Sequence, residues 1–369
     1  MNPLHLSYAA NATDGGIASA VTDLVAAQNA AGLNASWLTA DRYPALRRDR
    51  LLRDSVNRMH PDLLHVHGLW RSPTRTTSAF ESTGLPLVIA PHGMLNPVAF
   101  SHSRWKKLLV WQLWERRALM SSRCLHALCP AEASAIRDLL PKAAIAVIPN
   151  GVTVPAGEGN KLFSPTVATA PWQSAIPDNQ SVLLFLGRFH SGKGISALLQ
   201  AWQSVASEAE RQGWWLVLVG YGDGGALQRK LSHSAVQRCM VFGPVFGAAK
   251  EAALTTAKAF VLPSHFEALP MAALEAMAYG LPCLLSTACN LPQAFTAGAA
   301  LPAEPEPKAL AASLQQLFAL STAERAAMGG AGQDLVRQQF SWHQVANQTL
   351  QLYSWILGGG ERPSFVEVA

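Results

Sequence analysis

Two glutamates stand eight positions apart in a segment whose pattern predicts a strand end followed by a helix. Glu267 lies in the loop after a strand that ends near Pro263, and Glu275 lies on the helix that follows. Pro270 suits the first turn of that helix and Gly280 suits its end. Paired carboxylates at a strand end can accept hydrogen bonds from a polyol, and the free N–H groups of the helix start favour an anion.

Helical spacing places Glu275 beside Met271 and Ala278, on a face that is otherwise apolar. A carboxylate on such a face is costly unless something satisfies it, and the vicinal hydroxyls of a ribose would do so. The segment therefore suits a sugar nucleotide. A surface-exposed Glu267 with a partly exposed Glu275 is the alternative that needs no ligand.

A basic loop follows an earlier expected strand. Residues 187–194 nearly match the phosphate-loop pattern, but Gly194 stands where a magnesium-binding hydroxyl is required. Arg188 and Lys193 still give this loop two positive charges, which are apt for a diphosphate. Residues 220–225 match the dinucleotide pattern G-x-G-x-x-G, but no acid follows at 239–243 to hold a ribose, so a tight strand-to-helix turn is favoured.

The elements that must position these groups follow from composition and periodicity. With 49% apolar and 14% charged residues among 369, the chain is no disordered polymer and can build large cores. Short apolar runs alternate with helical patterns, among them Ile17–Ala31, which predicts a parallel α/β architecture. Strands are expected at residues 4–8, 35–39, 63–66, 87–90, 124–127, 144–148, 181–186, 214–219, 239–242, 259–262 and 283–286.

We expect two doubly wound, Rossmann-like domains that face each other across a cleft. Residues 1–160 form the first and residues 161–342 the second, with a linker within 153–178. A C-terminal helix at 343–357 should pack back on the first domain, and residues 358–369 should be a loose tail. Ligands of such sheets bind at the carboxyl ends of strands, where the loops above are expected.

The motifs together resemble retaining glycosyltransferases of family 4, also called glycosyl transferases group 1, which have the GT-B fold. The segment 267–275 resembles the family's E-x-x-x-x-x-x-x-E signature, and residues 187–194 resemble its basic diphosphate site. Asp14-Gly15-Gly16-Ile17 is similar to its N-terminal glycine loop, and Pro149-Asn150-Gly151-Val152 to its strand-end turn. The motifs occur in family order over about residues 4–357. Ala268 and Thr153 depart from the glycine and the acid of many relatives.

The resemblance implies roles for individual residues. Glu275 would bind the donor ribose and Glu267 the hydroxyls of the transferred sugar. Arg188 and Lys193 would neutralise the leaving diphosphate, as a metal does in other transferases. His92, in the strand-end sequence 90–94, matches the family's active-site histidine, which contacts the donor sugar near the reacting carbon.

Four further positions belong to the implied donor site. Gly15 and Gly16 lack a Cβ, so their backbone N–H groups can approach the β-phosphate or the acceptor. Ala268 and Leu269 follow the first glutamate of the signature and are expected to line the donor. Of these nine candidate residues, His92, Glu267, Arg188 and Lys193 are the expected catalytic ones.

The expected function is the retaining, metal-independent transfer of a sugar from a nucleotide-sugar donor to a glycan or lipid-linked acceptor in cell-surface polysaccharide synthesis. No cofactor and no metal are expected, and no Asp-x-Asp occurs in the sequence. Two alternatives stay open: a sugar-nucleotide 2-epimerase of the same fold, and a non-catalytic two-domain sugar-binding protein of the periplasmic type.

Charge and cysteine usage bear on location and partners. Residues 1–160 hold 16 Lys and Arg against 11 Asp and Glu, which suggests an anionic partner, and no nucleic-acid motif accompanies them. The basic, Trp-rich segment 104–117 suits peripheral contact with an anionic membrane, or is a buried helix with a solvated start. Five scattered cysteines, with neither a signal peptide nor a membrane span expected, favour the cytoplasm.

His65 and His67 flank Val66 in an expected strand and invite a metal hypothesis. Because neighbouring strand residues point to opposite faces, we expect His67 to line the cleft and His65 to pack inside. A metal-binding pair is the less favoured alternative.

Overall fold

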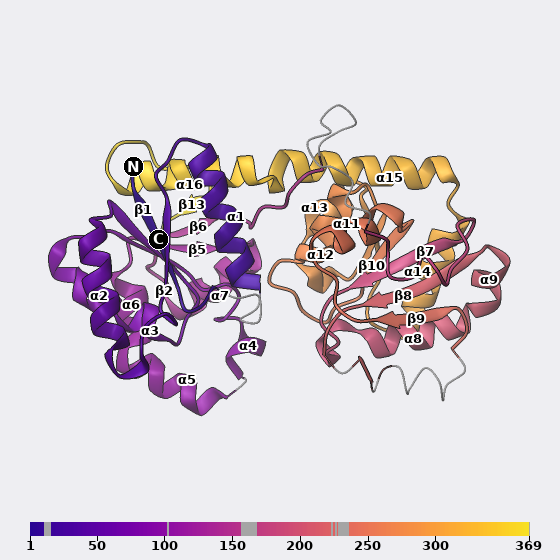
Figure 1. Ribbon diagram of the computed structural model, residues 1–369, viewed down its shortest axis with the longest axis horizontal. Helices are drawn as coiled ribbons and strands as arrows, with labels where there is room; N and C mark the ends of the chain where they lie inside the picture. Colours follow the sequence, from indigo (N-terminus) through magenta and orange to yellow (C-terminus); the bar gives the residue numbers. More distant parts are fainter. Residues whose placement is uncertain are drawn as a thin grey trace. The chain divides into compact units, whose positions relative to one another are not determined.

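The structure is a computed structural model that describes residues 1–10, 16–101, 103–155, 168–222, 224–225, 227 and 236–368. The chain divides into two compact units (Figure 1). Unit 1 contains residues 1–151 and 342–369, and unit 2 contains residues 152–341. Each unit is built on one sheet.

The sheet of unit 1 has seven strands, of which all but one run parallel. Most of their residues are apolar, as expected where helices cover both faces of a parallel sheet, but β1, β3 and β5 also carry buried histidines. The spatial order is β13 (Val366–Glu367), β6 (Ile145–Val147), β5 (Cys124–Ala127), β4 (Leu87–Ala90), β3 (Leu63–His67), β1 (Pro3–Ser7) and β2 (Ser36–Thr39).

Two helix layers enclose this sheet. Helices α1 (Gly16–Ala30) and α16 (Trp342–Ile356) lie side by side over one face, where Leu24 and Leu352 share a buried cluster (Figure 1). The other face buries Leu52 of α2 (Arg48–Met59) and Ile136 of α7 (Pro130–Leu139). The remaining helices of unit 1 are short: α3 (Ser72–Arg75), α4 (Pro97–Ser101), α5 (Arg104–Val110), a π-helical turn (Trp111–Glu115), α6 (Arg116–Ser121) and the 3-10 turns Ala45–Arg47 and Thr77–Thr83.

The sheet of unit 2 has six parallel strands. Their order is β12 (Ala300–Pro302), β11 (Cys283–Leu285), β10 (Ala259–Leu262), β7 (Ser181–Leu186), β8 (Trp214–Val219) and β9 (Cys239–Phe242). Its helices are α8 (Ile195–Ser204), α9 (Ala206–Arg211), α11 (Gly247–Thr256), α12 (Met271–Ala278), α13 (Pro292–Thr296), α14 (Pro307–Ala319) and α15 (Thr322–Leu335), with 3-10 turns at Ser191–Lys193 and Thr287–Cys289 and a π-helical turn at Val336–Phe340.

The strand order of each sheet reverses at one point. In unit 2 the chain runs from β7 outward through β8 to β9, then returns to place β10 on the other side of β7. In unit 1 the chain runs from β1 to β2 and then places β3 on the other side of β1. Loops that leave two such strands diverge, and the crevice between them is where open α/β sheets bind ligands.

The expected fold class, two parallel doubly wound sheets, is confirmed. All eleven expected strands are observed, six of them to the residue and the others within one residue at each end, whereas β12 was not expected. The loose tail at 358–369 is wrong in one respect: Val366 and Glu367 form β13, which pairs antiparallel with Ala146 and Ile145 of β6. Val366 is 4% exposed, so the tail both caps the edge of the sheet and buries an apolar side chain.

The basic, Trp-rich segment is helical from Arg104 to Ser121 with one π-helical turn. It buries Trp111 and Glu115 while Trp105, Leu109 and Leu113 are more than half exposed. Among the described residues, no helix is long and apolar enough to cross a membrane. One side of this segment is therefore core and the other presents apolar side chains to solvent.

Candidate active site

The reversal point of unit 2 brings together two loops, one after β7 and one after β10. Gly194 makes their close approach possible: its φ is +67°, and a Cβ there would lie 1.9 Å from the carbonyl oxygen of Pro263. The backbones are joined directly, since the N–H of His265 donates to the carbonyl of Gly192 at 2.8 Å. Gly194, which departs from the phosphate-loop pattern, is therefore needed where the two loops approach each other.

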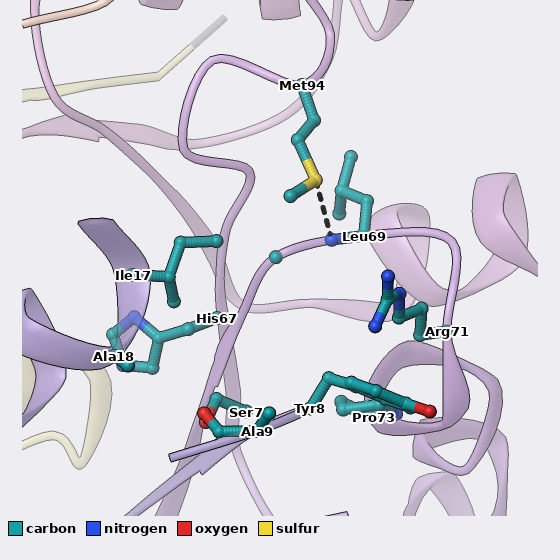
Figure 2. A pocket seen from close by; sticks show the side chains of 11 residues that line it. Ser7, Tyr8, Ala9, Ile17, Ala18, His67, Leu69, Arg71, Pro73 and Met94 are labelled. Atoms are coloured by element: carbon teal, nitrogen blue, oxygen red, sulfur yellow. Dashed lines mark hydrogen bonds between the residues drawn. The ribbon is translucent and has the colours of Figure 1, made fainter. Parts of the chain in front are cut away.

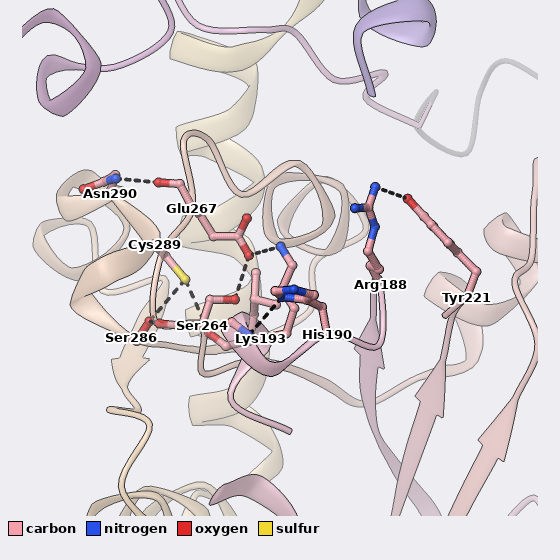
Figure 3. Close-up of polar contacts among 11 residues, drawn as sticks. Arg188, His190, Lys193, Tyr221, Ser264, Glu267, Ser286, Cys289 and Asn290 are labelled. Atoms are coloured by element: carbon pink, nitrogen blue, oxygen red, sulfur yellow. Dashed lines mark hydrogen bonds and ion pairs between the residues drawn. The ribbon is translucent and has the colours of Figure 1, made fainter. Parts of the chain in front are cut away.

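Lys193 and Glu267 meet across these loops (Figure 3). The Lys193 Nζ lies 2.5 Å from Oε1 of Glu267, and Ser264 Oγ donates to the same oxygen at 2.7 Å. The backbone of Glu267 is held as well, by Ala288 O at 3.0 Å and Asn290 Nδ2 at 2.5 Å. Among the described residues none bonds to Oε2, so the anchored carboxylate keeps one oxygen for a ligand hydroxyl.

Arg188 stands beside this pair on the β7 loop (Figure 3). Its guanidinium lies 5.4 Å from the ring centre of Tyr221, and Nη2 is 3.4 Å from the hydroxyl oxygen of that residue. The dinucleotide-like glycines support this arrangement, because a Cβ at Gly220 would lie 1.7 Å from the carbonyl oxygen of Gly187 and Gly222 has φ +121°. In its described part, that motif is a tight turn that seats the Arg188 loop.

The expected environment of Glu275 is wrong. The carboxylate is 27% exposed and forms an ion pair with Lys250 of α11, Nζ to Oε1 at 2.9 Å. Ala278 is buried, whereas Met271 is partly exposed like Glu275. The apolar face of α12 lies on its other side, formed by Ala273, Leu274, Ala276, Met277 and Ala278. A cation, rather than apolar surface, is therefore the neighbour of this carboxylate, and sequence reasoning missed Lys250.

Three of the remaining donor-site candidates have described positions. Leu269 is 8% exposed, so its side chain belongs to the core, and its carbonyl accepts from the N–H of Met271 at 3.0 Å. Ala268 is partly buried beside Glu267. Gly16 opens α1 on the surface with open space where a Cβ would be, and Gly15 lies outside the described residues.

The reversal point of unit 1 holds a cavity of about 90 Å³ (Figure 2). It is lined by the ends of β1 and β3 and the start of α1, including Tyr8, Ile17 and His67. The guanidinium of Arg71 lies 4.1 Å from the ring centre of Tyr8, and that of Arg48 lies 5.3 Å from the same ring. This cavity therefore combines a cationic rim with an aromatic wall.

His92 follows β4 in a left-handed backbone conformation, with φ +53°, and Gly93 follows with φ +77°. Its Nε2 lies 3.0 Å from Nδ1 of His67. Glu132 of α7 fixes the loop, since its carboxylate accepts from the N–H of Gly93 at 2.5 Å and of Leu128 at 2.8 Å. Burial lowers the pKa of His92 to about 3 and raises the pKa of Glu132. An acid in the first turn after a strand was the available signal for Glu132, which sequence reasoning missed.

His67 lines the cavity of unit 1 and His65 is packed inside, as expected, but the expectation that the two point to opposite faces is wrong. Residues two apart in a strand share a face, and their rings stack with centres 4.3 Å apart. The β1–β3 register adds His5 opposite His65, so three buried imidazoles lie within reach of one another. Their ligand atoms all lie within 4.8 Å, the spacing of a potential metal site.

Comparisons with known proteins agree with this architecture. A family model described as "Glycosyl transferases group 1" matches residues 167–334, and one described as "Glycosyl transferase 4-like domain" matches residues 45–151. The O-antigen chain mannosyltransferase B of Escherichia coli is 31% identical over 47% of this chain and 46% of its own length. The lipopolysaccharide 1,2-N-acetylglucosaminetransferase of Salmonella typhimurium is 27% identical over 86% of this chain and 80% of its own length.

The chain spans about half the length of several curated relatives that it matches. Among solved structures, the sucrose-phosphate synthase from Thermosynechococcus elongatus superimposes with a TM-score of 0.75 at 20% identity, covering 98% of this chain and all of that chain. The likeness covers both sheets and shows the fold. The chain belongs to the glycosyl transferases group 1 and has their GT-B fold.

Proposed function

We propose that the protein is a retaining, metal-independent glycosyltransferase. It takes a sugar from a nucleotide-sugar donor and passes it to a glycan or lipid-linked acceptor in the synthesis of a cell-surface polysaccharide. The observation that carries the proposal is the Lys193–Glu267 ion pair at the reversal point of unit 2, with Arg188 on the same loop. Two relatives are named for O-antigen chains and for lipopolysaccharide, which favours a surface glycan.

The ion pair suggests how the donor is received. A diphosphate carries more negative charge than the single carboxylate that Lys193 now faces, so the ammonium would turn to the diphosphate when the donor binds. Glu267 would then have Oε1 as well as Oε2 available for sugar hydroxyls, while Ser264 and the backbone contacts keep it in place. Arg188 and Lys193 would stabilise the charge that develops on the leaving diphosphate.

Retention is supported by the state of Glu132, the acid that holds the loop of His92 through the N–H of Gly93. Glu132 is 3% exposed, and each of its oxygens accepts a backbone N–H. A carboxylate held in this way is a poor general base for direct inversion. In our proposal the leaving phosphate takes the acceptor's proton, and the acceptor attacks from the face that the diphosphate leaves.

Metal independence rests on the two cations of the β7 loop, which supply the charge that a divalent ion would otherwise bring. The acceptor would bind in unit 1, whose cavity is lined by Arg71 and Tyr8, with the guanidinium of Arg48 near the same Tyr8 ring. The exposed apolar side chains of residues 104–121 and their basic start would suit peripheral contact with the inner face of the cytoplasmic membrane.

A thermal-shift screen of UDP-, GDP- and ADP-sugars tests the proposal. A sugar nucleotide at 100 times its Kd stabilises the folded state by about 2.7 kcal/mol, a rise of roughly 5–10 °C for a unit of this size. Lys193→Ala and Arg188→Ala should lose most of that rise. Lys258→Ala, which removes an exposed lysine just before β10 at the opposite end of the same strand, is the matched control. No rise with any donor, or an undiminished rise in both loop variants, would refute the proposal.

A further inference from the structure

We propose that a proton-ordered chain of buried side chains holds His92 as the Nε2–H tautomer, so that its Nδ1 accepts a hydrogen bond from a hydroxyl group of the transferred sugar. The inference rests on the proposed function and on the contact between His92 and the donor sugar that the family resemblance implies. It assigns positioning roles to buried residues of β1, β3, β5, α1 and α16 that sequence reasoning did not identify.

The chain is continuous from a backbone carbonyl to His92. All its side chains except His92 are at most 3% exposed. The contacts in order are Ile148 O to His126 Nε2 at 2.7 Å, His126 Nδ1 to His65 Nε2 at 3.2 Å, His65 Nδ1 to Tyr353 Oη at 2.6 Å, Tyr353 Oη to Gln28 Nε2 at 3.1 Å, Gln28 Oε1 to His5 Nε2 at 2.8 Å, His5 Nδ1 to His67 Nε2 at 2.9 Å and His67 Nδ1 to His92 Nε2 at 3.0 Å.

The carbonyl of Ile148 sets the direction, because a carbonyl oxygen can only accept. His126 must therefore carry its proton on Nε2, and a neutral imidazole then has only a lone pair on Nδ1. That lone pair requires a donor from Nε2 of His65. The Nδ1 of His65 is consequently an acceptor in turn.

The hydroxyl of Tyr353 links His65 of β3 to Gln28 of α1 and fixes which of the two groups donates to it. Its single hydroxyl proton goes to His65, so its oxygen accepts from the amide nitrogen of Gln28. Thr349 confirms this orientation of the amide: its hydroxyl donates to Ala346 O at 2.9 Å and accepts from Gln28 Nε2 at 3.0 Å. The amide oxygen of Gln28 is thereby fixed as the acceptor that faces His5.

The same reasoning fixes the protons of His5, His67 and His92. His5 donates from Nε2 to Gln28, so its Nδ1 accepts from Nε2 of His67. The Nδ1 of His67 must then accept from Nε2 of His92. Among the described residues none bonds to Nδ1 of His92, which is left with an unshared lone pair on a partly exposed ring.

Every imidazole in the chain has to be neutral for this assignment. Burial lowers the pKa of His5 and of His126 to about 4, and that of His92 to about 3. Burial also lowers the pKa of His65 and His67. An additional proton on any ring would place two donors face to face. The hydrogen-bond geometry and the lowered pKa values therefore both require neutral rings.

A metal ion on His5, His65 and His67 is the competing interpretation of the same cluster. All six ring nitrogens of these residues face another ring nitrogen or an oxygen partner at hydrogen-bond distance, between 2.6 and 3.2 Å. A metal would have to break these hydrogen bonds in a site without exposed side chains. We therefore favour the hydrogen-bonded chain.

The tautomer decides which ligand atom His92 can receive. An unprotonated Nδ1 accepts from an O–H group and repels a phosphate oxygen, which has only lone pairs to offer. The left-handed backbone at His92 and the Glu132 contact to Gly93 hold the ring where the chain ends. The chain thus selects a sugar hydroxyl over an anion at this position.

The experiment is a long-range ¹H–¹⁵N correlation spectrum of the full chain labelled with ¹⁵N-histidine, at pH 7.5. His92→Gln assigns the His92 signals. We expect one tautomer, with a protonated Nε2 and an unprotonated Nδ1. A protonated Nδ1 or a doubly protonated ring would overturn the proposed chain of hydrogen bonds. Stoichiometric binding of added zinc, with loss of the N–H signals of His5, His65 and His67, would overturn it as well.

Two variants at the adjoining position sharpen the test. His67→Phe removes the acceptor of His92 at similar volume, so His92 should become a mixture of tautomers. His67→Gln supplies an amide oxygen and should restore most of the single tautomer. His60→Asn, at an exposed left-handed position of the same unit, is the control and should change nothing. An unchanged His92 tautomer in His67→Phe would refute the assigned direction.

The sugar contact is tested by adding the nucleotide sugar that raises the melting temperature most. The donor should shift the Nδ1 resonance of His92, and the bare nucleoside diphosphate should not. A bound donor that leaves Nδ1 unmoved would overturn the sugar contact. Failure of every donor to bind would instead refute the proposed function, while the tautomer of the free protein would still decide the chain.

Discussion

Mild acid should destabilise unit 1 much more than unit 2. The perturbation is a change of pH from 7.5 to 5.5, and the responsible groups are the buried histidines of unit 1. Burial lowers the pKa of His5 and His126 to about 4, against 6.5 in an unfolded chain. Below pH 6.5 the unfolded state therefore binds protons that the folded state does not, and stability is lost as the pH falls towards 4.

Between the pKa of the unfolded state and that of the folded state, each pH unit changes the free energy of unfolding by about 1.4 kcal/mol per group. At pH 5.5 His5, His126 and His92 together cost about 4 kcal/mol. Burial lowers the pKa values of His65 and His67 as well, so these two groups add to the loss. Glu115 works in the opposite direction, since burial raises its pKa to about 7 and its proton stabilises the fold at pH 5.5 by about 2 kcal/mol. Glu132 acts in the same direction as Glu115, because burial raises its pKa too.

His5, His126, His92 and Glu115 together leave unit 1 with a net loss on the order of 2 kcal/mol, a substantial part of a typical folding free energy. Hydrogen–deuterium exchange with mass spectrometry, in a urea series at each pH, measures it for peptides from β1, β3 and β5. Peptides from β7, β8 and β10 are the internal reference, since the described histidines of unit 2 are exposed. Equal losses in the two units, or greater protection of unit 1 at pH 5.5, would refute the reasoning.

Three further predictions concern the loops, one buried acid and the reaction. Gly194→Ala should weaken nucleotide binding and cost at least about 1–2 kcal/mol of stability, because the added Cβ would clash with the carbonyl oxygen of Pro263. The control Gly243→Ala, which has open space at its Cβ, should change neither property. Melting curves measure the stability of both variants, and calorimetric titration measures their nucleotide binding. Glu115→Gln should enlarge the gain in stability of unit 1 from pH 6 to pH 8 by about 1.4 kcal/mol, since the wild type loses the stabilising proton of Glu115 as the pH rises through 7; urea unfolding at both pH values decides. Activity should survive EDTA with the donor's anomeric configuration kept in the product, and NMR showing an inverted linkage, or strict dependence on a divalent ion, would contradict the mechanism.

Sequence alone predicted the elements whose limits are set locally. α12 begins at Met271, directly after Pro270, and ends at Ala278, just before Gly280, whose φ of +74° only glycine adopts easily. Strands β7, β8 and β10 match because continuous apolar runs bounded by polar or small residues are typical of sheets buried on both faces. The same local logic located Arg188 and Lys193 on one loop.

The features that the sequence did not predict depend on contacts between segments that lie far apart in the chain. The Lys250–Glu275 pair joins two helices, and no pattern within either helix indicates the other. β13 exists because the edge strand β6 offers a partner, which its own two residues do not reveal. The histidine chain needed the order of β1, β3 and β5 in the sheet, although the shared face of His65 and His67 was available from strand periodicity.

The central claim is that the β7 and β10 loops and α12 of unit 2 bind a nucleotide sugar, with Glu267 on the sugar and Glu275 on the ribose. Calorimetric titration of Glu267→Gln and Glu275→Gln with the donor and with its bare nucleoside diphosphate tests it most directly, with the exposed Glu251→Gln of α11 as control. We predict that Glu275→Gln weakens both ligands, that Glu267→Gln weakens the donor far more than the diphosphate, and that Glu251→Gln affects neither. Equal losses for both ligands in both variants, or no loss in either, would contradict the claim.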